Sequence, residues 1–188
     1  MTARRAGPLV ALFVTAAVGY VVLSGSDDDG AGTEPSARAA AAGAQATCAT
    51  GGPGSTRVSS RNDAVLGPLV LIGARYAGSR PPDAFGGRGY KIPVTLPKGL
   101  SATLSVPRGA RRQVGLVFSL DTQDRAIERG VKGADHSVRF TACPGEGAAQ
   151  RTGWTGGFVV DRRRCAALVL TVASRRPKRH RVPLGRRC

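Results

Sequence analysis

The second half of the chain contains three short apolar segments, which connections containing glycine and proline separate. We expect strands at 138–142, 158–160 and 168–172. In the first of them Val138 and Phe140 alternate with the polar Arg139, and this is the period of a half-buried strand. Residues 138–172 are therefore the predicted centre of the fold.

The same alternation recurs upstream, over short segments that turn residues delimit. These segments are 90–96, 102–106 and 114–120. The segment 66–77 is a strongly apolar run that Pro68 interrupts, and a last, highly charged strand is expected near Val182 and Leu184. Proline lacks the N–H that a central strand donates, so Pro93 places its strand at a sheet edge or beside a bulge.

One segment, Asp121–Gly130, favours a helix. Asp121 is the expected N-cap, and Gly130 suits the left-handed residue that follows a helix end. Asp121 and Arg125 are spaced for an i,i+4 ion pair. A helix of about two turns is not stable alone, so it depends on the strands around it.

Seven or eight short strands, hairpin-length connections and one short helix predict an all-β domain. The expected architecture is an antiparallel β-sandwich, immunoglobulin-like or jelly-roll-like, and a barrel is the alternative. We place this domain at 48–188, a usual size for one domain.

The N-terminus carries a different signal. Residues 7–23 contain no charged side chain, with Arg4 and Arg5 before them and Asp27–Asp29 after them. Such a segment is near the lower limit for crossing a bilayer core of ~30 Å, and the charge order places residues 1–6 in the cytoplasm. We expect a single-pass transmembrane anchor in the cell membrane, with the C-terminal domain extracytoplasmic. The alternative is a cleaved signal peptide and a secreted protein.

Residues 24–47 connect this segment to the domain. They are rich in alanine, glycine, serine and acidic residues, and they show no period of a strand or a helix. Such a composition buries too little apolar surface to offset the entropy of ordering. We therefore predict a disordered linker.

Charge is the strongest feature of the composition. The chain has 28 basic and 12 acidic residues, a net charge of +16, which favours an anionic partner. The arginine-rich bias is equally compatible with a coding background that raises arginine without a partner. The candidate residues for an anionic surface lie in the last 27 positions, which contain no acid: Arg162, Arg163, Arg164, Arg175, Arg176, Lys178, Arg179 and Arg181.

The expected partner of this surface is a phosphate-bearing wall polymer, a lipid headgroup or another envelope protein. Charged residues on an edge strand also block aggregation, which is the structural alternative. Nucleic acid is not expected, because an exported domain does not meet it and no binding motif is present.

The sequence offers little for catalysis. His136 and His180 lie in no motif and are expected at the surface, although Asp135 could orient the imidazole of His136 in a hydrolase. Trp154 is expected in the core; stacking on a sugar ring is the alternative. We therefore predict a non-enzymatic module without a cofactor, and keep an extracytoplasmic hydrolase as the alternative.

Four cysteines permit three disulfide maps. Their gaps are far longer than the two to four residues usual in zinc sites, so no metal is expected. Cys143 and Cys165 bracket a strand–turn–strand unit and are the expected inner pair. Cys48 and Cys188 then join the two ends of the domain, which are often close together. Crossed pairing of Cys48 with Cys143 or Cys165 is not excluded.

The pattern FTACPGEGAAQRTGWTGGFVVDRRRC, behind an N-terminal apolar segment, resembles small exported actinobacterial proteins of unknown function. The resemblance covers mainly Phe140–Cys165 and the final VPLGRRC. It implies an envelope location and two disulfides, and it implies no activity.

Overall fold

The computed structural model describes residues 43–144, 150–173 and 175–188. Within them the chain is mostly β-sheet, with thirteen strands in three sheets. The first sheet has the order β1 (Ala44–Ala46), β9 (Ser137–Thr141), β7 (Ser101–Ser105), β12 (Arg164–Val172) and β13 (Lys178–Leu184). The second has the order β2 (Gly52–Pro53), β10 (Arg151–Trp154), β6 (Val94–Pro97), β4 (Leu69–Leu71) and β3 (Ala64–Leu66). The third consists of β5 (Gly89–Lys91), β11 (Gly157–Val160) and β8 (Val114–Val117).

The second and third sheets are two parts of one layer. The chain passes from β5 to β6 through Ile92 and Pro93, and from β10 to β11 through Thr155 and Gly156. At this bend the Ile92 amide donates to the Gly156 carbonyl at 2.9 Å. Pro93 thus lies at the break between two sheets, where a missing N–H costs no ladder bond.

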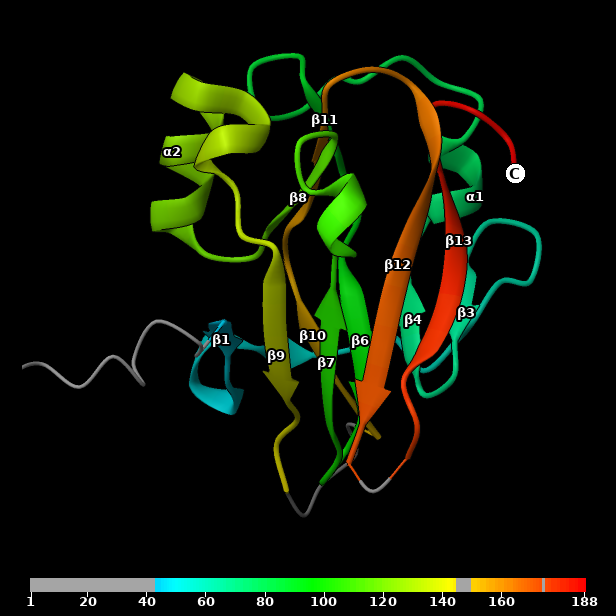
Figure 1. Ribbon diagram of the computed structural model, residues 1–188. Coiled ribbons are helices and arrows are strands. Elements are labelled where there is room, and N and C mark those ends of the chain that lie inside the picture. Colours follow the sequence, from blue (N-terminus) through cyan, green and yellow to red (C-terminus); the bar gives the residue numbers. More distant parts are fainter. Residues whose placement is uncertain (1–42, 145–149, 174) are drawn as a thin grey trace, which may run out of the picture. The chain divides into compact units, whose positions relative to one another are not determined.

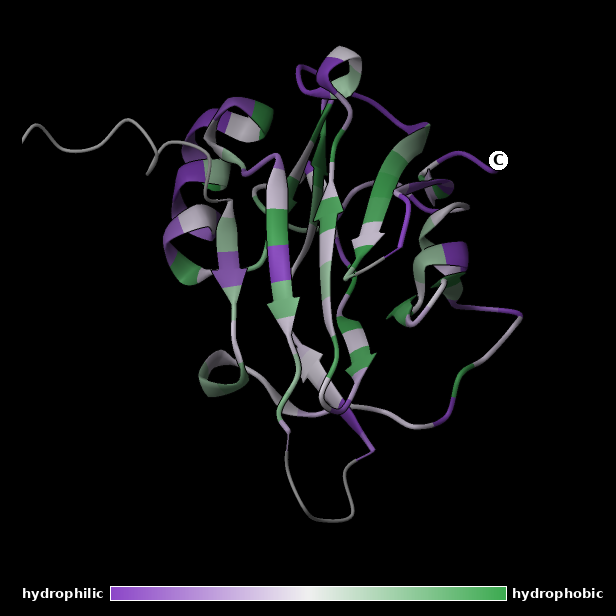
Figure 2. Ribbon diagram, turned by 60° about the horizontal axis from the view of Figure 1, so that its bottom comes forward, coloured by the Kyte–Doolittle hydropathy of each residue, from purple (hydrophilic) through white to green (hydrophobic). Residues whose placement is uncertain are grey.

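The first sheet packs against this bent layer, as Figure 1 shows with β7, β9, β12 and β13 in front of β4, β6 and β10. The core contains residues from both layers. The ring centroid of Phe140 of β9 is 5.3 Å from that of Trp154 of β10 and 5.0 Å from that of Phe118. In the first sheet the alternating strand patterns bury one face, and in Figure 2 strands show alternating green and pale or purple segments. In the third sheet β8 and β11 are buried on both faces, because Val117 and Val159 pack against Ala126 of α2. The predicted all-β class is confirmed, and two packed layers are consistent with a sandwich.

The strand β1 lies inside the predicted linker 24–47. It pairs with β9 in parallel, with Ala46 opposite Phe140, so the sheet is not purely antiparallel and the ordered chain starts ahead of Cys48. Of the three residues of β1 only Ala46 is buried, at 1% exposure, while Gln45 is exposed. The rest of the linker and the predicted anchor 7–23 lie outside the described residues. No helix in the part described is long and apolar enough to cross a membrane.

The main helix, α2 (Leu120–Arg129), begins one residue before the predicted start. Its N-cap is Ser119, whose hydroxyl accepts from the Thr122 amide at 3.1 Å, so the prediction of Asp121 was wrong. Gly130 ends the helix, as predicted, with φ 59°, but its ψ of −134° is not that of the predicted left-handed helical conformation. Leu120, expected as the last residue of a strand, instead opens the helix with its side chain 80% exposed. A second helix of one turn, α1 (Ala74–Ala77), ends a segment predicted to be a strand.

Both disulfides differ from the predicted map. Cys48 is bonded to Cys143, and Cys165 to Cys188. The predicted Cys143–Cys165 pair fails because β7 lies between β9 and β12, which therefore run in the same direction. Cys143 follows the end of β9 and Cys165 is near the start of β12, so the two lie at opposite ends of the sheet.

The observed pairs follow from the same topology. Because β1 is parallel to β9, Cys48 and Cys143 both follow the ends of neighbouring strands, with Cα atoms 4.8 Å apart. At the other pair the chain turns at Gly185, with φ 75°, and returns beside the start of β12. The Cys165–Cys188 bond thereby fastens the C-terminus to that strand.

Candidate functional site

The predicted basic residues lie along one edge of the first sheet. Arg162 and Arg163 are in the turn before β12, Arg164 is its first residue, and Arg175 and Arg176 are in the hairpin after it. The remaining three, Lys178, Arg179 and Arg181, are on β13. β12 has nine residues, so the two groups are separated by roughly 26 Å at ~3.3 Å per residue. The residues form a stripe along the edge and not one compact cluster.

Two arginines of this stripe, Arg179 and Arg181, are exposed on its outer face, and the Arg181 Nε donates to the Cys165 Sγ at 3.2 Å. In the register of the hairpin Arg179 lies opposite Val169 and Arg181 opposite Ala167. They alternate with the inward Val182, which is fully buried. Arg179 and Arg181 therefore point the same way, two residues apart on an exposed edge strand.

Other arginines of the stripe have structural partners. Arg164 is only 14% exposed and forms an ion pair with Asp161 at 2.6 Å. Arg163 donates to the Gly185 carbonyl at 2.6 Å, which holds the turn before Cys188. These two residues stabilise the end of the hairpin, and are less available to a ligand than the arginines of β13.

Arg139 joins the basic surface although the sequence analysis did not assign it a role. Its strand neighbours Val138 and Phe140 are buried, so its side chain faces outward. Arg139 and Arg175 line one hollow of about 370 Å³ together with Ser101. The alternating pattern already placed Arg139 on the outer face; only the order of the strands brings it beside Arg175.

Apart from Asp161, which pairs with Arg164, no acidic residue lies on β12, on β13 or in the described part of the hairpin between them. Asp121, Asp124 and Glu128 are on α2, and Asp63 is buried, accepting from the Gly73 and Ser59 amides at 2.7 Å each. No acidic residue follows Asp161 in the sequence. The edge formed by β12 and β13 is therefore positively charged over most of its length.

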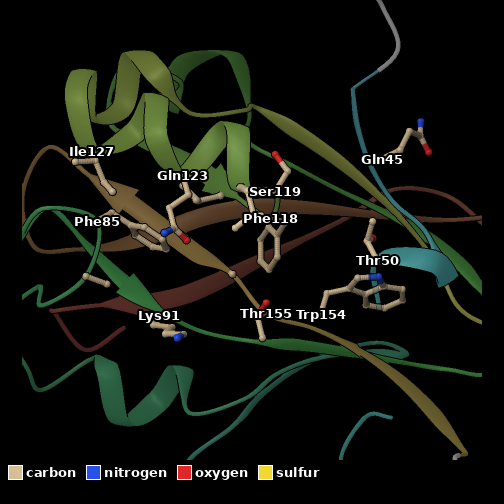
Figure 3. A pocket seen from close by; sticks show the side chains of 14 residues that line it. Gln45, Thr50, Phe85, Lys91, Phe118, Ser119, Gln123, Ile127, Trp154 and Thr155 are labelled. Atoms are coloured by element: carbon tan, nitrogen blue, oxygen red, sulfur yellow. The ribbon is translucent and has the colours of Figure 1, made fainter. Parts of the chain in front are cut away.

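A groove of about 690 Å³ lies between α2, β1 and the bend that joins β10 to β11 (Figure 3). Phe85, Phe118 and Trp154 supply aromatic surface to it, and Leu120 and Ile127 come from α2. Its polar side chains are Gln45, Thr50, Lys91, Ser119, Gln123 and Thr155. The sequence analysis missed this site, because its residues come from six separate segments of the chain.

Trp154 forms part of the wall of this groove. Its side chain is 3% exposed and its Nε1 donates to the Thr47 carbonyl at 2.9 Å. A sugar ring cannot stack on a face that the core already covers. The expected core position of Trp154 is confirmed.

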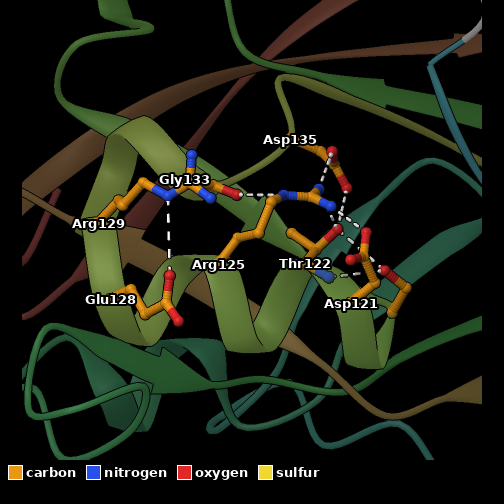
Figure 4. A network of polar contacts seen from close by, with 8 residues as sticks. Asp121, Thr122, Arg125, Glu128, Arg129, Gly133 and Asp135 are labelled. Carbon is orange, nitrogen blue, oxygen red and sulfur yellow. Dashed lines mark hydrogen bonds and ion pairs between the residues drawn. The ribbon is translucent and has the colours of Figure 1, made fainter.

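Asp135 belongs to a polar network under α2 (Figure 4). The Thr122 hydroxyl donates to Asp135 at 2.7 Å and accepts from Arg125 at 3.0 Å, while Ser119 donates to Thr122 at 2.9 Å. Arg125 also pairs with Asp121, as predicted, and donates to the Gly133 carbonyl at 3.2 Å. No imidazole takes part in these contacts, so the network holds α2 and does not activate a nucleophile.

His136 is adjacent to Asp135 in sequence but takes no part in the hydrogen bonds of the Asp135 network, although the charge of Asp135 partly offsets the lowering of its pKa. Its Nδ1 is buried without a hydrogen-bond partner, and burial lowers the pKa of His136, as does the charge of Arg111. His180 is half-buried in the same way: burial lowers its pKa, and Lys178 lowers it further. The 690 Å³ groove contains neither Asp135 nor His136, so the arrangement that a hydrolase would need is not assembled there.

Metal ligands are not gathered in the described residues: no group of three or more histidine, cysteine, aspartate or glutamate side chains is placed to hold an ion. All four cysteines are in disulfides. Comparison with protein-family models, curated proteins and solved structures found no match.

Proposed function

We propose that this chain is a non-enzymatic binding module of the cell envelope, held at the membrane by residues 7–23. Its basic edge contacts phosphate-bearing wall polymers or lipid headgroups, which share the same anionic chemistry. The observation that carries the proposal is the outward, solvent-exposed placement of Arg179 and Arg181, neither of which is paired with a carboxylate in the described residues, on an edge strand.

The geometry of the basic edge supports this function. A linear polyanion offers phosphates at intervals, and the stripe offers arginines at both ends of β12 and along β13. The hollow between Arg139 and Arg175 adds a site where two guanidinium groups can meet one phosphate. A field of one sign raises the local concentration of such partners even where no single contact is strong.

The disulfides support an extracytoplasmic location. Two bonds, with no free cysteine in the described part, suit an oxidising compartment. Retention at the membrane is tested by N-terminal sequencing of the cell-associated protein. A start at or next to Met1 supports the anchor, whereas a start after residue 23 would show a cleaved signal peptide.

The binding proposal is tested with the full chain in detergent, using polyphosphate beads in one arm and phosphatidylglycerol vesicles in the other. We expect binding that weakens as the Debye length falls from ~10 Å at 0.1 M salt to ~3 Å at 1 M. The arm that retains the protein at the higher salt identifies the source of the phosphate.

Charge-reversal variants distinguish binding by the basic edge from binding caused by the net charge of the whole protein. Arg179→Glu with Arg181→Glu should abolish most of the binding at 0.15 M salt. Arg129→Glu with Lys132→Glu makes the same change in net charge beside α2, away from the stripe, and should leave most of it. Equal losses in both pairs, or binding that ignores salt, would refute a specific basic edge.

A further inference from the structure

One side of the 690 Å³ groove is formed by α2, which has exposed apolar residues there, although the exposed side of a surface helix is usually polar. Leu120 and Ile127 are seven positions apart, on one side of α2, and are 80% and 44% exposed. The opposite side of α2 buries Thr122 and Ala126 in the protein body. The helix therefore presents an additional apolar side, and that side faces the groove.

The interior of the groove continues this apolar surface (Figure 3). Phe118 is held by two edge-to-face contacts, with Phe140 and with Phe158. Phe85 lies over a glycine: a Cβ at Gly89 would be 2.7 Å from its ring. Phe85 itself has φ 53°, a conformation that costs free energy and that tends to occur at functional sites. The aromatic surface is thus fixed by the fold before any ligand arrives.

Among the described residues, one charged side chain lines this groove. Lys91 reaches it from β5, is exposed, and has no carboxylate partner in the described residues. The other polar groups there are neutral amides and hydroxyls, such as Gln45 and Gln123. A ligand that carries one negative charge is therefore matched, and one that carries several is not.

We propose that this groove binds a long-chain fatty-acyl carboxylate, a site separate from the basic edge. The carboxylate pairs with Lys91 and accepts from the neighbouring amides, and the acyl chain covers Leu120, Ile127 and Phe85. The volume is within the roughly 300–1,000 Å³ of small-molecule sites, which combine apolar walls with a few polar groups in this way.

The test is photo-crosslinking of the full chain in detergent with palmitic acid that carries a diazirine at the end of the chain. We expect labelled peptides from the segments around Phe85, Leu120 and Ile127 after proteolysis and mass spectrometry. The same probe with an alcohol in place of the carboxylate should label these segments roughly tenfold less, because it cannot pair with Lys91. Labelling confined to other segments would overturn the proposal.

Variants at exposed positions keep the test independent of folding. Lys91→Gln should lower carboxylate labelling of the groove to the level of the alcohol, and Lys91→Arg should retain it. Leu120→Gln with Ile127→Gln should lower labelling by both probes, while Val65→Gln, an equally exposed apolar residue outside the groove, should not. Unchanged labelling in Lys91→Gln, or an equal loss in Val65→Gln, would also overturn it.

The same variants distinguish this site from the basic edge. Arg179→Glu with Arg181→Glu should label normally in the groove, and the groove variants should bind polyphosphate normally. If one of the two proposals fails, these variants can therefore still test the other.

Discussion

The indole nitrogen of Trp154 donates a hydrogen bond to the carbonyl oxygen of Thr47, at 2.9 Å and across 107 positions of sequence. Thr47 directly follows β1 and precedes Cys48, whose disulfide leads to the end of β9. Two long-range interactions, one polar and one covalent, thus fix the short first strand to both layers. Because β1 buries only Ala46, we expect these two interactions to hold it in place.

Replacing Trp154 by phenylalanine should therefore destabilise the whole domain. The change removes the bond to Thr47, about 1 kcal/mol, and part of the core packing, so we expect a loss of about 1–3 kcal/mol in the free energy of unfolding. Trp154→Ala should cost about 3–5 kcal/mol. Urea denaturation of the oxidised chain measures both. Tyr76→Phe, at a side chain that is 56% exposed, is the control and should change little.

The two disulfides should contribute unequally to stability. In the chain-entropy model the Cys48–Cys143 bond, with a separation of 95, contributes about 4.7 kcal/mol, and the Cys165–Cys188 bond, with a separation of 23, about 3.4 kcal/mol. Paired alanine variants of each bond, unfolded in urea, test this order. Non-reducing peptide mapping checks the connectivity, and a peptide that links Cys143 to Cys165 would contradict it.

Stability should fall in mildly acidic solution because of His136. Burial lowers the pKa of His136 in the folded state, so the unfolded chain binds the proton more tightly. The contribution of His136 therefore leaves the free energy of unfolding at its highest above pH ~6.5, the usual histidine pKa. The free energy of unfolding declines as the pH falls below that value. His136→Gln should flatten the dependence between pH 8 and 5.5. A slope that this variant leaves unchanged would assign the effect to other groups, and Glu128→Gln is the control at an exposed carboxyl.

Alanine at Gly156 should disturb both the sandwich and the groove. A Cβ there would collide with Phe118, with Cε1 at 2.8 Å, and with the Val117 carbonyl. We expect a loss of about 1–3 kcal/mol, typical of overpacking. Gly52→Ala is the matched control, because nothing lies within 4 Å of its Cβ position. Comparable Tm values for the two variants would mean that the bend tolerates a side chain.

The basic edge could be predicted from the sequence only in part. The run of arginines after Asp161 was visible without a structure, and β13 does expose Arg179 and Arg181. The partner of Arg163 was not visible, because its bond to the Gly185 carbonyl depends on how the end of β13 returns beside β12. The ion pair of Arg164 with Asp161 is local, three residues apart, but the sequence analysis did not identify it. The groove could not be predicted, because no local pattern links Lys91 to Leu120 or Trp154.

The amino-acid sequence by itself determined the all-β class, most strand positions and the end of α2 at Gly130. These depend on local physics: a period of two between buried and exposed side chains, and a backbone conformation that glycine adopts easily. The tertiary structure alone decided the pairing of β1 with β9, and with it the disulfide map. Ala44–Ala46 has no large apolar residue to mark it as a strand; its place comes from a neighbour more than ninety residues away. Strand order is a property of long-range register, and a short local pattern does not contain it.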